Sequence, residues 1–322
     1  MFDPSLYREF RKIQIGNTEI HPGTQARSNY IVGALPSGTR VGIQMEIFRS
    51  PLPGPHVLLI GGVHGDEVNG VELVRRTLEQ NLFTQLTHGS VIVIPLLNVY
   101  GFINFSRDIP LGKDVNRSFP GTLKGSLASR VAGILTKHVL PQADLVVDCH
   151  TGTQHRYNYP QVRISKGDET SLEIARAFNP PFIVHKGPLQ GSLRKTAHKA
   201  SKACLIYEGG EALRLDGYAI SKGLEGIGRT LQYLGMMKDV SRASQEAVEI
   251  THSSWLRASA SGLFVWTKGS GKSILKGEPL GFIGDPFGSR KVVILAPRDG
   301  YIIGHTNTSV VNQGDALFNI GY

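Results

Sequence analysis

The stretch that decides the fold lies at residues 57–80 and reads VLLIGGVHGDEVNGVELVRRTLEQ. It begins with a short apolar run at 57–60, and its length and the glycines that follow it are typical of a buried β-strand. A helical pattern follows at 67–80. One apolar stripe of that pattern consists of Val68, Val71, Val74 and Leu78. A buried strand followed at once by an amphipathic helix predicts the first unit of an α/β fold.

The alternation of strand and helix patterns continues to about residue 234. Further apolar runs, bounded by Gly, Pro or Asn, predict buried strands at 91–97, 145–149, 182–184 and 204–207. Two more apolar stripes predict helices at 127–139 and 224–234. Strands that alternate with helices predict a three-layer α/β fold, in which a mixed, mostly parallel sheet is covered on both faces.

The pattern changes after residue 240. Helical periodicity ends, glycine becomes frequent and short strand patterns follow one another, which predicts a β-rich domain at 246–322 after a catalytic domain at 1–245. Two stretches of this tail, 261–283 and 299–320, are similar and have comparable spacings between their glycines, which predicts an internal repeat.

The second copy of the repeat resembles the barrel-sandwich module that carries biotin or lipoate on a lysine. In this chain the hairpin at 284–290 lacks the lysine signature of that module, although Lys291 is nearby. We therefore expect a barrel-sandwich-like domain with a structural or gating role and no cofactor attached to Lys291.

Composition limits the class of protein. The chain has 322 residues, of which 40% are hydrophobic and 19% charged, ordinary values for a globular protein with a full-sized core. Lys and Arg number 35 against 26 Asp and Glu, and the net charge of +9 suits nucleic acid, an anionic membrane surface or small acidic substrates. The sequence has no run of five basic residues and no interleaving of basic and aromatic residues, so we expect no nucleic-acid partner.

The sequence also predicts the compartment. The N-terminal residues lack the apolar segment of a signal peptide, and no apolar stretch approaches the roughly 20 residues needed to span a bilayer. Cys149 and Cys204 lie inside apolar runs, as buried reduced thiols do. We expect a cytoplasmic protein with no membrane partner; the oligomeric state stays open, a homo-oligomer included.

Polar residues follow the carboxyl ends of four predicted strands. His64 and Glu67 open the first helix, three residues apart and on one side of its first turn. Asn98, His150 and Glu208 each come directly after a later strand. Because ligands bind beyond the carboxyl ends of the strands in an open parallel sheet, these side chains are predicted to meet at one rim.

Two histidines and one carboxylate form a three-ligand set that leaves the fourth position to water, as in catalytic zinc sites. His64, Glu67 and His150 supply such a set, although H-x-x-E alone also occurs in polar strand-to-helix turns. Asp148 lies two residues before His150, on the same face of the strand, and either orients the imidazole or caps a neighbouring backbone group. We expect one Zn²⁺ per chain; the ligands alone do not separate zinc from other divalent ions.

A long loop at 107–121 joins the second and third of these strands. Long loops inside compact domains are usually functional or disordered. Asn116 and Arg117 offer an amide and a planar guanidinium side by side, which suits a substrate carboxylate. A solvated loop with two surface arginines is the competing interpretation.

Four motifs occur in one order: H-x-x-E at 64–67, D-x-N-R-x-F-P-G at 114–121, D-x-H-x-G at 148–152 and YEGG at 207–210. Together they resemble the succinylglutamate desuccinylase/aspartoacylase family, a branch of the zinc carboxypeptidase superfamily, over roughly residues 57–235. The resemblance implies a sheet of zinc-carboxypeptidase type and hydrolysis of the acyl amide of a small, anionic N-acyl amino acid. It also implies that the zinc ligands are His64, Glu67 and His150.

The resemblance implies further roles for single residues. Glu208 matches the general acid/base of the family, with Glu211 as a close competitor. Arg107 falls where the family has an arginine that polarises the scissile carbonyl and stabilises the oxyanion.

Substrate contacts are implied in the same way. Asn116 and Arg117 match the pair that holds the substrate carboxylate. Arg194 is either a second contact to an anion or a surface residue of the helix that begins there.

Two other functions compete with this interpretation. A zinc carboxypeptidase acting on short or modified peptides would use the same ligands. A non-enzymatic binding or scaffold protein would be expected to lack a ligand or the base, whereas here all four positions are filled.

Overall fold

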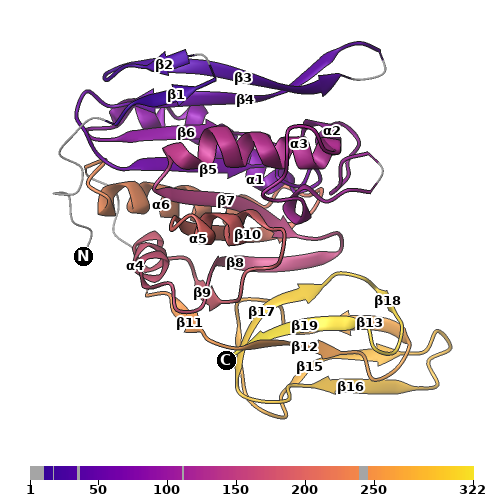
Figure 1. Cartoon of the computed structure of the whole chain (residues 1–322). Coiled ribbons are helices and arrows are strands. Elements are labelled where there is room, and N and C mark those ends of the chain that lie inside the picture. Colours follow the sequence, from indigo (N-terminus) through magenta and orange to yellow (C-terminus); the bar gives the residue numbers. More distant parts are fainter. Residues whose placement is uncertain (1–10, 17, 35–36, 111, 239–245) are drawn as a thin grey trace.

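The computed structural model describes residues 11–16, 18–34, 37–110, 112–238 and 246–322 (Figure 1). Three parts of the sequence predictions lie outside these ranges. They are the N-terminal residues from which we predicted that there is no signal peptide, Leu111 of the predicted long loop, and residue 245 at the predicted domain boundary. Within them, no helix combines the length and the apolar character needed to cross a bilayer.

The described strands, in chain order, are β1 (Ile13–Ile15), β2 (Thr18–Ile20), β3 (Gln25–Ala34), β4 (Arg40–Arg49), β5 (His56–Gly61), β6 (Ser90–Ile94), β7 (Leu145–Gly152), β8 (Arg156–Ile164), β9 (Phe182–His185), β10 (Ala203–Glu211), β11 (Val248–Ile250), β12 (Ser253–Arg257), β13 (Gly262–Trp266), β14 (Ser273–Ile274), β15 (Pro279–Gly284), β16 (Lys291–Leu295), β17 (Gly300–Thr306), β18 (Val310–Val311) and β19 (Ala316–Gly321). The α-helices are α1 (Val68–Glu79), α2 (Val99–Ile103), α3 (Leu127–Ile134), α4 (Glu169–Phe178), α5 (Leu193–Lys199) and α6 (Gly217–Tyr233). Short helical turns are η2 (Leu82–Gln85), η3 (Val115–Arg117), η4 (Leu135–Val139) and η5 (Leu140–Gln142).

One mixed sheet forms the centre of the molecule. Strands β6, β5, β7 and β10 lie side by side and parallel. Antiparallel β4 and β3 extend the sheet beyond β6, and antiparallel β8 follows β10 at the other side. Strands β9 and β11 continue from β8 in parallel pairing. The predicted mixed, mostly parallel sheet is confirmed.

Alternate side chains of the central strands enter two separate cores. In β5, Leu58 and Ile60 join the core under α3 and α5, whereas Val57 and Leu59 join the core under α1, α4 and α6. Side chains alternate between the two faces of a strand, so an uninterrupted apolar run is what a strand buried on both faces requires. The helices on the two faces give the three predicted layers (Figure 1).

The C-terminal part is β-rich and antiparallel, as predicted. A four-stranded sheet has the order β16-β15-β13-β18, and it packs over β12, β19 and β17 around a core that includes Phe264, Leu280 and Phe318. The two similar stretches of sequence each supply an antiparallel pair, β13 with β15 and β17 with β19. Strand β17 also pairs with β8, so this part continues the central sheet.

Candidate functional site

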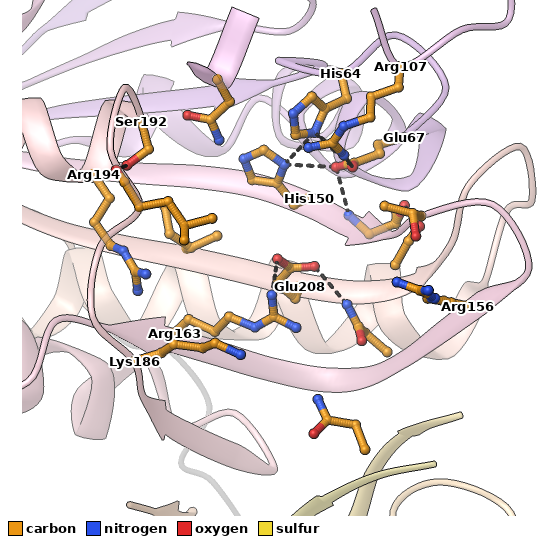
Figure 2. Close-up of a pocket in the computed structure, with 18 of the residues that line it drawn as sticks. His64, Glu67, Arg107, His150, Arg156, Arg163, Lys186, Ser192, Arg194 and Glu208 are labelled. Carbon is orange, nitrogen blue, oxygen red and sulfur yellow. Dashed lines mark hydrogen bonds and ion pairs between the residues drawn. The ribbon is translucent and has the colours of Figure 1, made fainter. Parts of the chain in front are cut away.

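A cavity of about 250 Å³ opens beyond the carboxyl ends of β5, β7 and β10 (Figure 2). Its lining includes most of the residues that the sequence singled out: His64, Glu67, Arg107, Asn116, Arg117, His150, Arg194 and Glu208. Because parallel strands end at the same edge, the residues at the ends of β5, β7 and β10 meet there, and the long loop and α5 add the others.

Two histidines and a glutamate form a buried cluster at one end of this cavity. His64 lies in the turn after β5, Glu67 directly precedes α1, and His150 lies in β7. The two Glu67 oxygens lie 2.7 Å from the Nδ1 atoms of His64 and His150, which are 3.1 Å from each other. One ligand atom from each residue lies within 4.8 Å of the others, so the three could hold one metal ion.

The outer nitrogens of both histidines face carboxylates. Nε2 of His150 lies 2.8 Å from Asp148 Oδ2, and Nε2 of His64 lies 3.3 Å from Asp114 Oδ1. A metal-binding histidine usually gives its second N–H to such a carboxylate, which fixes the tautomer. Both Nδ1 atoms are then left for a cation, and with the Glu67 oxygen they form a donor set that fits a divalent metal.

Electrostatics keeps Glu67 in the form that binds a cation. Burial opposes charge on the carboxyl, but His64 and His150 outweigh it and hold the pKa of Glu67 well below its ordinary value. Burial also opposes charge on His150, yet Asp148 and Glu67 raise the pKa of that imidazole. Glu67 is therefore ionised, as metal binding requires.

Arg107 bridges the metal-ligand cluster and the long loop. Its Nη1 donates to Glu67 Oε1 over 3.0 Å, and its Nη2 donates to Asp114 Oδ2 over 3.0 Å. Asn98, which we expected at the same rim, is instead buried under this loop. Its side chain caps α2 by accepting from the Gly101 N–H and donates to the Arg107 carbonyl, so it supports Arg107 from behind.

Asn116 and Arg117 belong to a short turn, η3, and line the cavity. Asp114 caps this turn by accepting from the Asn116 N–H over 2.6 Å. The Asn116 Oδ1 accepts from the Leu193 N–H over 2.9 Å, so its NH₂ group is what it can offer a ligand. Arg117 is half-exposed and also lines the cavity. The pair is placed at the cavity and not on a remote solvated loop.

Glu208 lies in the cavity and Glu211 does not. The Oε1 of Glu208 accepts from Arg163 Nη1, and its Oε2 accepts from Asn158 Nδ2, each over 2.8 Å. Glu211 instead contacts the side chain of Asn307. Of the two candidate bases, geometry favours Glu208.

Arg194 is buried in the wall of the cavity. Its side chain is 8% exposed, and Nη2 donates to the Gly187 carbonyl over 3.1 Å. Its position near the start of α5 follows from the Ser192 cap, whose Oγ accepts from the Lys195 N–H. The alternative of a surface position on the helix is therefore wrong.

The sequence interpretation missed a group of lining residues from β8, the loop after β9, and the C-terminal strands. They are Arg156, Asn158, Arg163, Lys186, Trp255 and Asn319. The signal that could have found some of them is the segment RYNYPQVRI at 156–164, in which charged and aromatic residues alternate with residues that turn out to be buried.

Comparison with known proteins gives the same family that the motifs suggest. The succinylglutamate desuccinylase/aspartoacylase catalytic domain matches residues 53–234. The N-alpha-acetyl-L-2,4-diaminobutyric acid deacetylase of Halomonas elongata is 28% identical over 280 residues, which cover 82% of this chain and 81% of that protein.

Solved structures agree. A succinylglutamate desuccinylase/aspartoacylase from Rhodobacter sphaeroides has a TM-score of 0.82 at 25% identity and covers 94% of this chain and 97% of its own. The product-bound ectoine utilization protein EutE (DoeB) from Ruegeria pomeroyi has a TM-score of 0.82 at 22% identity, with 97% and 99% covered. Since the catalytic-domain match spans more than half of the chain and includes all four motifs, the chain belongs to the succinylglutamate desuccinylase/aspartoacylase family.

Proposed function

We propose that the protein is a zinc-dependent deacylase that hydrolyses the acyl amide of a small, anionic N-acyl amino acid. The observation that carries the proposal is the buried cluster of His64, Glu67 and His150, which shares a cavity with Glu208. The Halomonas elongata relative is a deacetylase of an N-acetylated amino acid, which supports the same class of reaction.

His64, Glu67 and His150 would hold the zinc ion, which would supply Lewis-acid catalysis at this end of the cavity. Glu208 takes a proton from the attacking water and passes it to the leaving amine, a role typically worth about 10²–10⁴-fold in rate. Arg107 lies beside the ligand cluster with its guanidinium partly exposed, in position to stabilise negative charge that develops on the carbonyl oxygen.

Substrate positioning falls to the walls of the cavity. The NH₂ group of Asn116 and the guanidinium of Arg117 bind one carboxylate of the substrate, and Arg194 offers a second anion contact from the start of α5. Two fixed anchors align the amide with the base and turn binding energy into orientation.

The test is metal analysis of the purified protein, combined with amine release from a panel of N-acyl amino acids before and after chelation. We expect about one zinc per chain, loss of hydrolysis on chelation and recovery when zinc returns. Glu208→Ala should retain the metal and lose hydrolysis. A metal-free protein whose hydrolysis is insensitive to chelators would contradict the proposal.

A zinc carboxypeptidase is the alternative within the same chemistry, because the ligand set serves both reactions. Dipeptides assayed beside N-acyl amino acids separate the two, and faster release from dipeptides would favour the peptidase.

A further inference from the structure

The proposed base is held on both of its oxygens. Arg163 Nη1 donates to Oε1 of Glu208, and Asn158 Nδ2 donates to Oε2, each over 2.8 Å. Figure 2 shows Glu208 between His150 on one side and Arg163 with Lys186 on the other. A carboxylate oxygen that accepts a charge-assisted bond from a guanidinium is poorly available to accept a proton.

Cations outnumber carboxylates at this end of the cavity. Arg163, Lys186 and Arg194 all line it, and of the described lining residues only Glu208 and the metal-ligand candidate Glu67 carry carboxylates. Arg194 is 8% exposed, and its buried Nη1 has no hydrogen-bond partner. Burial and the neighbouring Arg163 lower the pKa of Lys186, as expected where like charges are crowded.

An unpartnered buried guanidinium nitrogen beside two further cations points to a missing anion. Arg163 is suited to reach it. Its Nε lies 3.4 Å from Gln161 Oε1, which steadies the stem, while the side chain is 23% exposed and lines the cavity. A small swing of the guanidinium can therefore exchange Glu208 for an anion that enters beside Lys186 and Arg194.

We infer that Arg163 is a positioning residue that exchanges partners: it holds Glu208 before substrate binds, and it turns to a second carboxylate of the substrate and so releases Glu208 Oε1 for proton transfer. Asn158 keeps Oε2, so the released base stays in place. The inference rests on the proposed function and adds that the substrate carries an anionic group at this end. That group is either the end of the acyl chain or the side chain of the amino acid.

Matched substrates test the exchange and distinguish the two sources of the carboxylate. N-succinyl-alanine against N-butyryl-alanine varies the charge of the acyl end, and N-acetylglutamate against N-acetylglutamine varies the side chain. We expect one of the two pairs to show a kcat at least about tenfold higher for the acidic member, because only that member releases the base. Equal kcat values within both pairs, with differences confined to KM, would overturn the inference.

The variant Arg163→Gln gives the sharper result. It should lower kcat for the acidic member while maintaining or raising kcat for the neutral member, so that the ratio between them approaches one. Arg163→Lys, which keeps a charge at this position, should restore part of the ratio. Arg27→Gln is the matched control, because it also removes an arginine paired with a glutamate: Arg27, exposed on β3, pairs with Glu46 of β4. A structural role for Arg163 would instead lower kcat for both members equally.

Glutarate binding, measured by calorimetry on the metal-loaded protein, tests the exchange without turnover. Glu208→Gln removes the competing charge, so it should bind glutarate at least about fivefold more tightly than the wild type, and adding Arg163→Gln should cancel the gain. No gain in Glu208→Gln would overturn the inference. If no N-acyl amino acid is hydrolysed, the proposed function fails. The glutarate measurement still tests whether Arg163 exchanges Glu208 for a carboxylate ligand, because it requires no turnover.

Discussion

The Asp148 carboxylate lies directly behind a candidate metal ligand. Its Oδ2 accepts from Nε2 of His150 over 2.8 Å, and the residue is fully buried. Asp148→Asn removes the charge at nearly constant volume. It should lower zinc affinity by about 10–100-fold, the usual effect of losing such a partner, as measured by competition with a chelator.

Thermal unfolding of the metal-free protein is the control for this substitution. Because Asp148→Asn also removes the charged partner of the buried His150 imidazole, it should lower the thermal stability of the metal-free protein, so zinc affinities are compared at a temperature at which both proteins are folded. Unchanged zinc affinity in Asp148→Asn would contradict the assigned role.

His56, at the start of β5, makes stability depend on pH. Burial and the nearby Arg11 lower the pKa of His56 to about 4, although Asp144 and the Gln142 carbonyl oppose the shift. The unfolded chain, with an ordinary pKa of about 6.5, then binds more protons between pH 6.5 and 4. The free energy of unfolding should therefore fall as pH drops through this window, with up to about 3 kcal/mol from this residue.

Urea denaturation at several pH values measures this contribution. His56→Asn can still donate to the Gln142 carbonyl, which lies 3.0 Å from Nδ1, and it does not titrate. It should flatten the pH dependence between 6.5 and 4, whereas His88→Asn, at an exposed position, should not. An unchanged slope in His56→Asn would rule out this source.

Replacing either of two glycines in α6 by alanine should change the free energy of unfolding in opposite directions: downward at Gly226 and not downward at Gly217. A Cβ on Gly226 would lie 2.0 Å from Cε1 of Phe178, a fully buried ring of α4. Alanine would gain about 1 kcal/mol in helix propensity, but the clash should cost more, with a net loss of about 1–3 kcal/mol. Gly217 is the matched control, because nothing lies within 4 Å of its added Cβ. Urea denaturation of both variants checks the contrast, and equal stabilities would contradict the close packing of α4 and α6.

Elements buried on both faces could be predicted from the sequence. The predicted strands at 57–60, 145–149 and 204–207 lie within β5, β7 and β10, and apart from Asp148 all their side chains are apolar. Strand β3 lies at the edge of the sheet with mostly exposed or half-buried side chains, so it has no apolar run.

Strand β8 was missed for a different reason. Its Asn158 and Gln161 are buried because they face the cavity or hydrogen-bond across the sheet, which removes the apolar pattern. Pro160 lies where the register against β10 shifts, the kind of position at which a strand tolerates proline. The candidate metal ligands and the proposed base lie at the ends of apolar strands, so the sequence could predict that they meet. Arg163 lies in β8, which has no apolar run, so its place in the cavity could not be predicted in this way.

At the scale of the whole molecule, the fold gathers positive charge in one cavity. Six cationic residues line it against two carboxylates: Arg107, Arg117, Arg156, Arg163, Lys186 and Arg194 against Glu67 and Glu208. These residues come from the long loop, β8, the loop after β9 and α5, and the net charge of +9 is therefore partly a property of the site. A cavity of this size and charge suits a small anionic substrate.

The division into domains at 1–245 and 246–322 stays a prediction, and the pairing of strands across it has an energetic consequence. Strand β17 pairs with β8 at His305 and Tyr157, and β11 pairs with β9. The C-terminal core thus rests on strands that belong to the central sheet. Loss of either part would expose unpaired backbone groups at β8 and β9, so we expect the two parts to unfold as one cooperative unit.

Two optical probes can follow the parts separately, because both tryptophans of the chain, Trp255 and Trp266, lie in the C-terminal part. The described α-helices all lie before residue 234, so far-ultraviolet circular dichroism near 222 nm, at about the helix minimum, reports mainly on the other part. Urea transitions recorded by tryptophan fluorescence and by circular dichroism should share one midpoint and one slope. Two separate midpoints would show that the C-terminal strands unfold independently, and the wall that Trp255 and Asn319 add to the cavity could then be lost without unfolding the metal-ligand cluster.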